Sequence, residues 1–321
     1  MQIRERKGML IIVILVLLAA LLLFITCSVG HSDVPEISDG LIASDLPDED
    51  EVIAEVAEDI YTEEDEVVDD VEDEIEDEAD DEIEEEPVVE DFEIYSIEGT
   101  ADSLTGRDWE RMVAWRNNAT LLAGLHRDSV IINMDPSENV VYLTFDDGPD
   151  SRNTVSVIDI LLEYDVSATF FFTGENIRRN EDVVKKAFDA GFPIGLHGYS
   201  HTSFLNMTSD DIIAELNETN DLLEAITGER SAIMRPPYGA MGEEEIGIIN
   251  SLDLMIYLWS LDTLDWTQRD ATDILQNIKE FLRPGEIILL HNHSGRHMVP
   301  DILPSIIEFI RDEGFEMRAL P

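Results

Sequence analysis

The sequence predicts an α/β fold in which a parallel β-sheet, open or closed into a barrel, is covered on its outer side by helices. Two observations carry this prediction. From Val140 to the C-terminus, short apolar runs alternate with amphipathic stretches, and clusters of polar residues follow most of the apolar runs directly. Such alternation is typical of βα units, because two parallel strands need a long crossover between them, usually a helix.

Seven apolar runs have the length and composition of buried strands. These runs are Val140–Phe145, Ala168–Phe172, Pro193–Leu196, Ala232–Met234, Met255–Ser260, Glu286–Leu290 and Glu316–Leu320. Six stretches between them have helical spacing or capping signals. These stretches are Thr154–Glu163, Asp182–Ala190, Thr208–Leu223, Glu243–Asn250, Ala271–Leu282 and Ile302–Arg311. A further helix is predicted over residues 107–125, where apolar residues at helical spacing indicate a face that packs onto the domain.

Charge is distributed unevenly along the chain, whose formal net charge is −52 over 321 residues. Residues 33–98 contain 33 acidic residues and no Lys or Arg. Such a segment cannot bury enough apolar surface to offset its ordering entropy, so we expect a disordered, extended spacer. A low-affinity buffer of divalent cations and a partner-binding tail are the alternatives. The chain shows no basic cluster that suits nucleic acid, so no nucleic-acid partner is expected.

The N-terminus predicts a membrane anchor. Arg4, Arg6 and Lys7 precede an uncharged apolar run from Met9 to Ile25, which as a helix would extend about 25 Å, close to the thickness of a bilayer core. Positive residues stay cytoplasmic, so we expect a single-pass protein of the cell membrane with its domain outside the cytoplasm. A cleaved signal peptide, which would give a secreted protein, is the alternative. The single cysteine, Cys27, excludes an intrachain disulfide and a Cys-rich zinc site.

Polar clusters follow five of the predicted strands. In chain order they are Asp146-Asp147, His197 with His201, Arg235-Pro236-Pro237-Tyr238-Gly239, Asp262 with Asp265 and Trp266, and His291. The carboxyl ends of parallel strands meet at one edge of a sheet, where the sites of α/β proteins assemble. We therefore expect these clusters to form one site.

The residue types in these clusters are those of a metal-dependent hydrolase. Two histidines four residues apart, with a carboxylate, suit zinc and similar divalent ions. Hydrolysis then needs a base for the water proton and an acid for the leaving group, and two adjacent carboxylates with a separate histidine can fill these roles. Each motif alone has a simpler interpretation: a coincidence on a helix surface, a turn, a rigid loop or a core histidine. Their joint occurrence in order, each after a predicted strand, favours the site.

At these residues the chain resembles the NodB-type polysaccharide deacetylases, carbohydrate esterase family 4, which include peptidoglycan N-acetylglucosamine and chitin deacetylases. The resemblance runs from about Val140 to the C-terminus. Five motifs carry it: Thr144-Phe145-Asp146-Asp147-Gly148-Pro149, His197-Gly198-Tyr199-Ser200-His201, Arg235-Pro236-Pro237-Tyr238-Gly239, Asp262-Thr263-Leu264-Asp265-Trp266 and Leu289-Leu290-His291. The fold it implies is a distorted parallel (β/α) barrel of about seven units.

The resemblance also implies a role for each motif residue. Asp147, His197 and His201 would hold one divalent ion, with Zn²⁺ expected and Co²⁺ or Mn²⁺ as alternatives. Asp146 would be the base, oriented by Arg235. His291 would be the acid, and Asp265 would set its tautomer. The backbone N–H of Tyr238 would bind the oxyanion, and Trp266 and Leu289 would line the acetyl pocket.

Four regions follow from these observations. They are a cytoplasmic basic stub with a transmembrane signal anchor (1–32), a disordered acidic linker (33–98), an N-terminal extension that packs on the domain (99–138) and a polysaccharide deacetylase catalytic domain (139–321), which we expect to be monomeric.

The resemblance implies a hydrolase that removes N-linked acetyl groups from N-acetylglucosamine residues of a cell-wall or extracellular polysaccharide, with peptidoglycan expected. Two departures stand out: Gly198 replaces a small hydroxyl residue that steadies the histidine loop, and Asn292 replaces an Asp. Loss of such support commonly weakens metal binding. A catalytically weak glycan-binding protein, a structural wall spacer and a deacetylase of another exported polysaccharide remain alternatives.

Overall fold

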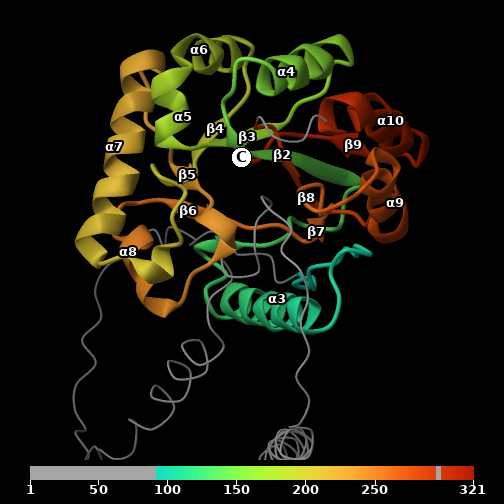
Figure 1. Cartoon of the computed structure of the whole chain (residues 1–321), viewed down its shortest axis with the longest axis horizontal. Coiled ribbons are helices and arrows are strands. Elements are labelled where there is room, and N and C mark those ends of the chain that lie inside the picture. The colour runs from blue at the N-terminus through green and yellow to red at the C-terminus, as the bar shows by residue number, and fades with distance from the viewer. Residues whose placement is uncertain (1–91, 294–297) are drawn as a thin grey trace, which may run out of the picture. The chain divides into compact units, whose positions relative to one another are not determined.

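The structure is a computed structural model that describes residues 92–293 and 298–321 (Figure 1). The predicted signal anchor, Met9–Ile25, and nearly all of the predicted acidic linker lie outside the described residues. Within the described ranges, no helix is both long enough and apolar enough to cross a membrane.

One parallel sheet organises the domain. Its strands lie in the order β1 (Val130–Ile131), β6 (Met255–Tyr257), β5 (Ile233–Met234), β4 (Ile194–Leu196), β3 (Thr169–Phe172), β2 (Val140–Gly148), β8 (Ile287–His291) and β7 (Leu261–Asp262), and β9 (Glu316–Met317) also pairs with β2. Every pair of these strands is parallel. The predicted α/β class with a parallel sheet is therefore confirmed.

The sheet curls without closing into a complete barrel. Among the described residues no strand pair joins β7 to β1, so the sheet forms a half-barrel (Figure 1). Strand β3 is buried at all four positions, as expected for a sheet covered on both faces. Phe145 of β2 stacks on Phe170 of β3 with ring centroids 5.4 Å apart. This packing fixes the central strands, whose carboxyl ends carry the first polar cluster.

Helices surround the sheet. They are α3 (Arg107–Leu125), α4 (Asn153–Glu163), α5 (Gly174–Arg179), α6 (Glu181–Asp189), α7 (Ser209–Thr227), α8 (Glu243–Asn250), α9 (Ala271–Phe281) and α10 (Met298–Asp312). All of them except α5, which the sequence did not predict, lie within about four residues of the predicted bounds. The hydroxyl of Thr208 accepts a hydrogen bond from the N–H of Asp211, so the predicted cap does begin α7. That helix ends at Gly228, which adopts the left-handed conformation that glycine favours.

The predicted strand Met255–Ser260 is too long at its C-terminal end, because β6 stops at Tyr257 and the next strand, β7, begins only at Leu261, at the far edge of the sheet. β6 pairs with β1 and β5, whereas β7 pairs with β8. The guanidinium of Arg235 binds the carbonyls of Tyr257 and Leu258 between them, at 2.9 and 2.8 Å. Because a side chain occupies these carbonyls, they cannot bond to a neighbouring strand, and β6 ends there. The chain then crosses the opening of the half-barrel to β7.

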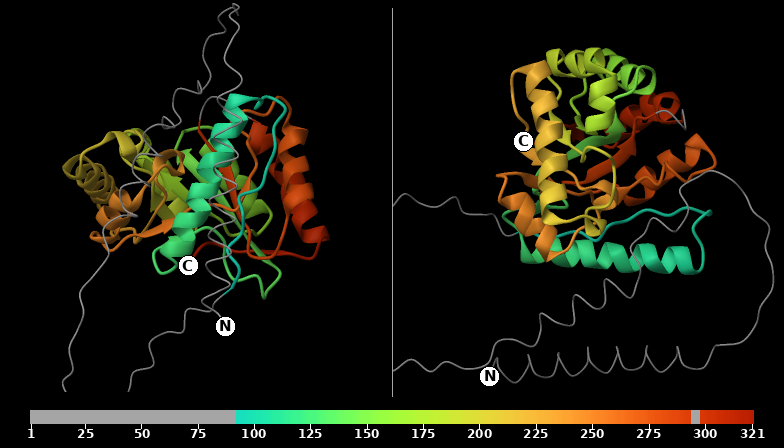
Figure 2. Two further views of the ribbon diagram at one scale, coloured as in Figure 1. Left: turned by 90° about the horizontal axis from the view of Figure 1, so that it is seen from below. Right: turned by 60° about the vertical axis from the view of Figure 1, so that its left-hand side comes forward.

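The segment from about Tyr95 to Met134 contributes to both edges of the sheet. Glu98 forms a parallel bridge with Leu261 of β7, and β1 pairs with β6 at the other edge. Between these two contacts, α3 lies across the open side of the half-barrel, between α8 and α9 (Figures 1 and 2). Residues 92–98, which the sequence assigns to the linker, thus contact the domain, and Ile97 is buried.

Candidate active site and metal centre

Five polar clusters from separate strand ends gather at the carboxyl edge of the sheet. Asp146 and Asp147 are among the last three residues of β2 and do not lie in the loop after it, and His291 is the last residue of β8. Asp146 and His291 are register partners on these neighbouring strands. His197 follows β4 and Arg235 follows β5. Because all strands run in one direction, their ends deliver these side chains to one place.

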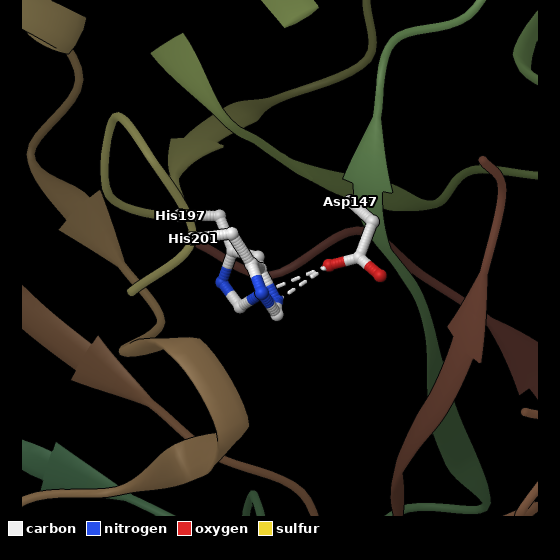
Figure 3. A group of neighbouring side chains, drawn as sticks. All are labelled: Asp147, His197 and His201. Carbon is white, nitrogen blue, oxygen red and sulfur yellow. Dashed lines mark ion pairs between the residues drawn. The ribbon is translucent and has the colours of Figure 1, made fainter. Parts of the chain in front are cut away.

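Three side chains form a compact candidate metal centre (Figure 3). The Oδ1 atom of Asp147 lies 3.3 Å from Nε2 of His197 and 2.9 Å from Nε2 of His201. One ligand atom from each residue lies within 4.8 Å of the other two. These are the residues that the sequence predicts as metal ligands.

The contacts of this cluster fit a divalent cation. His197 bonds through Nδ1 to the carbonyl of Arg235 at 2.8 Å, which assigns its proton to Nδ1 and leaves the Nε2 lone pair directed at the cluster. Asp147 Oδ1 is buried without a hydrogen bond of good geometry. Burial acts to raise the pKa of Asp147, but contacts with His197, His201 and His293 hold it well below its usual value. An ionised carboxylate with two imidazoles suits zinc and related ions.

The loop that carries the two histidines is held by α7. Gly198 has φ +66°, a conformation that L side chains rarely adopt. The carboxylate of Glu215 accepts hydrogen bonds from the N–H groups of Tyr199 and Ser200, at 2.5 and 2.8 Å. The hydroxyl of Thr219 donates to the carbonyl of Gly198 at 3.1 Å. The loop therefore has hydrogen-bonded support although position 198 has no hydroxyl group.

Asp146 is held by Arg235 inside the core. Arg235 Nη1 donates to Asp146 Oδ1 at 2.7 Å and to the hydroxyl of Thr144 at 2.9 Å. Its guanidinium lies 4.3 Å from the ring centroid of Phe171 and is completely buried. Burial lowers the pKa of Arg235, and the Asp146 carboxylate opposes that shift. Arginine starts from a very high pKa, so the guanidinium stays charged, and its hydrogen bond fixes the orientation of the Asp146 carboxyl group.

His291 is paired with Asp265. One oxygen of Asp265 contacts Nδ1 of His291 at 2.7 Å, and the other accepts the backbone N–H of His291 at 2.8 Å. Burial acts to lower the pKa of His291, but Asp265 and the carboxylates of the site raise it to about 10. The imidazole is therefore protonated at neutral pH, with Asp265 holding the Nδ1 proton. Nε2 is then the nitrogen that can donate a proton to a ligand.

The remaining predicted residues flank this centre. Tyr238 has φ 62° inside the short helix Pro237–Gly239, and its ring lies edge-on to His201 with centroids 4.6 Å apart. Leu289 is buried on β8, and Trp266 is partly buried in the loop after β7. An oxyanion role for Tyr238 and an acetyl pocket lined by Trp266 and Leu289 stay predictions.

Two contributors to the site are absent from the sequence-based set. Thr144 holds Arg235 and is held in turn by the carbonyl of Ile288, to which it donates at 2.8 Å. His293 approaches the second oxygen of Asp147, with Nδ1 at 3.1 Å. Its position two residues after His291 is the only signal in the sequence that could have indicated it.

Comparison with known proteins places the chain in a family. A family model described as polysaccharide deacetylase matches residues 133–257. A peptidoglycan N-acetylglucosamine deacetylase from Bacillus cereus is 35% identical over 183 residues, which are 56% of this chain and 66% of that protein. The solved structure of the Bc1960 peptidoglycan N-acetylglucosamine deacetylase is 31% identical, covers 62% of this chain and 94% of that one, and has a TM-score of 0.60.

The chain belongs to the polysaccharide deacetylase family. The predicted family and enzyme class, hydrolases of carbon–nitrogen bonds other than peptide bonds, are thereby confirmed. The family match includes the candidate metal centre and the Asp146–Arg235 pair of this polysaccharide deacetylase, and it ends before Asp265 and His291.

A second solved structure shows that family membership does not by itself guarantee activity. It is described as a CE4 family pseudoenzyme from Bacillus anthracis, is 27% identical, covers 60% of this chain and 67% of that one, and has a TM-score of 0.57. Activity within the family therefore depends on the residues that each member places in its site.

Proposed function

We propose that this protein is a metal-dependent deacetylase that hydrolyses N-acetyl groups on N-acetylglucosamine residues of peptidoglycan. The observation that carries the proposal is the placement of Asp146 and His291 on neighbouring strands beside the Asp147–His197–His201 cluster. One group is a carboxylate held by a buried guanidinium, and the other is a protonated imidazole. Such a base and acid around an electrophilic centre suit the hydrolysis of an amide.

Asp146 acts as the base in this proposal. The Oδ1 atom is engaged by Arg235 at 2.7 Å, whereas Oδ2 faces the cluster, 3.8 Å from His197 Nε2. Oδ2 is thus placed to accept the proton of a water that attacks the acetyl carbon. A divalent ion held by the three ligand side chains would polarise the acetyl carbonyl and increase the acidity of that water.

His291 acts as the acid. Amide hydrolysis must protonate the nitrogen of the departing sugar, because an amide anion is a very poor leaving group. The Nε2–H of His291 is the donor, and Asp265 keeps the ring in the orientation and charge state that donation requires. Two carboxylates and one imidazolium thus divide the work of metal binding, proton uptake and proton delivery.

Acetate release tests the proposal directly. The full chain is incubated with peptidoglycan or chitooligosaccharide and Zn²⁺ or Co²⁺, and acetate is measured with and without a chelator. We expect metal-dependent release that Asp146→Asn abolishes. No release by the wild-type protein, or equal release by the wild type and Asp146→Asn, would contradict it.

A catalytically weak glycan-binding protein is the second candidate. Gly198 supports this candidate because the family usually has a hydroxyl residue at this position. The resemblance to a pseudoenzyme supports it as well. The contacts of Glu215 and Thr219 with the histidine loop argue against it. Calorimetry with chitooligosaccharide, beside the acetate assay, separates the two: binding without turnover would favour this candidate.

The glycan and the location of the protein are proposals of the same kind. Relatives described as peptidoglycan deacetylases favour peptidoglycan, and the apolar run Met9–Ile25 after three basic residues favours a membrane anchor with the domain outside. Mass spectrometry of wall fragments from cells with and without the gene would identify the sugar that loses acetyl groups. Fractionation of the same cells would show whether the chain stays in the membrane or is secreted.

A further inference from the structure

We infer that helix α3 helps to hold the site in place, and that Arg116 on this helix is a positioning residue for the acid, His291. The inference rests on the proposed function, in which His291 protonates the leaving amine. Helix α3 lies outside the residues 133–257 that match the family model, so the match does not assign it a role.

Arg116 connects α3 to the loop after β7. Its side chain is 7% exposed, and Nη2 lies 3.4 Å from Oδ2 of Asp262, whose side chain is 5% exposed. Nη1 donates to the carbonyl of Gly99 at 2.9 Å. Gly99 has φ +133°, and a Cβ there would lie only 2.0 Å from the carbonyl oxygen of Asp262. The guanidinium therefore binds two segments that are already in close contact at the edge of the sheet.

Asp262 passes this restraint to the residue that holds the acid. Its Oδ1 accepts the N–H of Leu264 at 2.9 Å. Leu264 has φ 55°, a left-handed conformation that is unfavourable for leucine. The next residue is Asp265, whose two oxygens bind the ring and the backbone of His291. The chain of contacts thus runs from Arg116 through Asp262 and the turn at Leu264 to the Asp265 carboxylate.

Burial makes Asp262 depend on Arg116. Burial raises the pKa of Asp262, and the Arg116 guanidinium is the main opposing influence. Without that cation, the Asp262 carboxylate would be a poorly compensated buried charge beside Asp265. Either protonation of Asp262 or movement of the loop would weaken the hydrogen bond that keeps Leu264 in its conformation.

The preceding residue of the helix, Trp115, contacts the other half of the site. Its ring lies 5.3 Å from that of Trp259, and its Nε1 donates to the carbonyl of Gly239 at 3.3 Å. Gly239 follows Tyr238, whose backbone N–H is the predicted oxyanion donor. Trp115 and Arg116 therefore support different steps, which gives an internal comparison for a test.

The test uses two substrates that differ in their need for an acid. A chitooligosaccharide amide must have its leaving nitrogen protonated, whereas 4-nitrophenyl acetate releases a stable phenolate without a proton donor. The full-length, zinc-loaded wild type is compared with Arg116→Met, Arg116→Lys and Trp115→Leu. Arg107→Met, the same change at an exposed position of α3, is the matched control. Melting temperature and zinc affinity are measured for each variant.

We expect Arg116→Met to lower kcat for the amide by about 10- to 100-fold, part of what general acid catalysis contributes. Its KM, its zinc affinity and its rate on the ester should stay close to those of the wild type. Arg116→Lys should recover part of the amide activity because it keeps the charge, and it carries the test if Arg116→Met does not fold. Trp115→Leu should lower both rates, and Arg107→Met neither.

Two results would overturn the inference. One is an unchanged amide rate in both Arg116 variants, and the other is a parallel fall of amide and ester rates, which would mean a purely structural role. A wild-type protein inactive on both substrates would instead reject the proposed function itself. Asp146→Asn must abolish ester hydrolysis for that rate to report on the site.

Discussion

The proposed base, Asp146, and the proposed acid, His291, are held in different ways, and the parts of the site around them are called the base side and the acid side. Asp146 lies on a central strand, and its partner Arg235 is completely buried and also binds Thr144 and two backbone carbonyls. His291 has a side chain that is 18% exposed, and its partner Asp265 lies in a loop after a two-residue edge strand. The base is thus fixed by the core, and the acid is fixed by a loop.

The two sides of the site also take their supporting contacts from different parts of the chain. The base side is built from β2, β5 and the end of β6, which lie within the residues that match the family model, and from Leu258, the first residue after them. The acid side needs contacts from α3, which precedes the matched residues. The Asp146–Arg235 pair is more deeply buried than the His291–Asp265 pair, so breaking it should lower the free energy of unfolding more.

The largest effect is expected for Asp146→Asn. The amide cannot accept the water proton, so turnover should fall by at least 100-fold, the lower range of what a general base contributes. Acetate release from chitooligosaccharide measures it, and a zinc titration of the same variant is the control. Turnover within a few-fold of the wild type would mean that another group is the base.

Arg235→Met should be the most destabilising change. It removes the cation from a completely buried ion pair and leaves the Asp146 carboxylate without its partner. Breaking such a pair costs about 3–5 kcal/mol of the free energy of unfolding. Urea denaturation measures the loss, with Asp265→Asn as the comparison on the acid side. A smaller loss for Arg235→Met than for Asp265→Asn would reverse the proposed contrast.

Asp265→Asn should change the pH dependence of activity. The carboxylate raises the pKa of His291, which is about 10, so the acid form persists through neutral pH and is lost as pH rises through that value. Removing the negative charge lowers the pKa of His291, and the alkaline limb of kcat/KM should move to lower pH. The profile is measured with the amide substrate and zinc in excess. An alkaline limb that stays in place would separate Asp265 from the acid.

The smallest effect is expected for Gly198→Ser, which restores the residue type usual in the family. Serine at φ +66° is strained by about 1 kcal/mol, and its Cβ would lie 3.3 Å from Pro237. Because Glu215 and Thr219 already hold the loop, zinc affinity should not increase and the melting temperature should fall slightly. Calorimetric titration with zinc is the measurement. Tighter binding in the variant would show that the glycine does weaken the site.

Much of the fold could be predicted because its local signals agree with the tertiary structure. Helix Glu243–Asn250 has the predicted bounds, and the predicted strands Ala168–Phe172 and Pro193–Leu196 differ from β3 and β4 by one residue at one end. Strands of a parallel sheet are buried on both faces, so their sequences are continuous apolar runs. Such runs are easily distinguished from exposed strands, in which apolar and polar residues alternate. The gathering of Asp147, His197 and His201 followed from the shared direction of the strands.

Contacts between distant segments could not be predicted in the same way. The end of β6 at Tyr257, three residues before the predicted end, depends on the guanidinium of Arg235, which takes the carbonyls that a longer strand would need. The restraint of Asp262 by Arg116 joins residues 146 positions apart. Neither has a periodic signal, because a side chain that reaches across a fold leaves no pattern in its own neighbourhood.

The sequence alone determined the class of the fold and the family, and it predicted which residues bind the metal and move protons. These depend on residue type and order, which parallel strands convert into a common site. Only the tertiary structure decided how the base and the acid are held, that the histidine loop at Gly198 is supported from α7, and that α3 crosses the open side of the half-barrel. Those outcomes depend on burial and on distances between remote side chains, which exist only after the chain has packed.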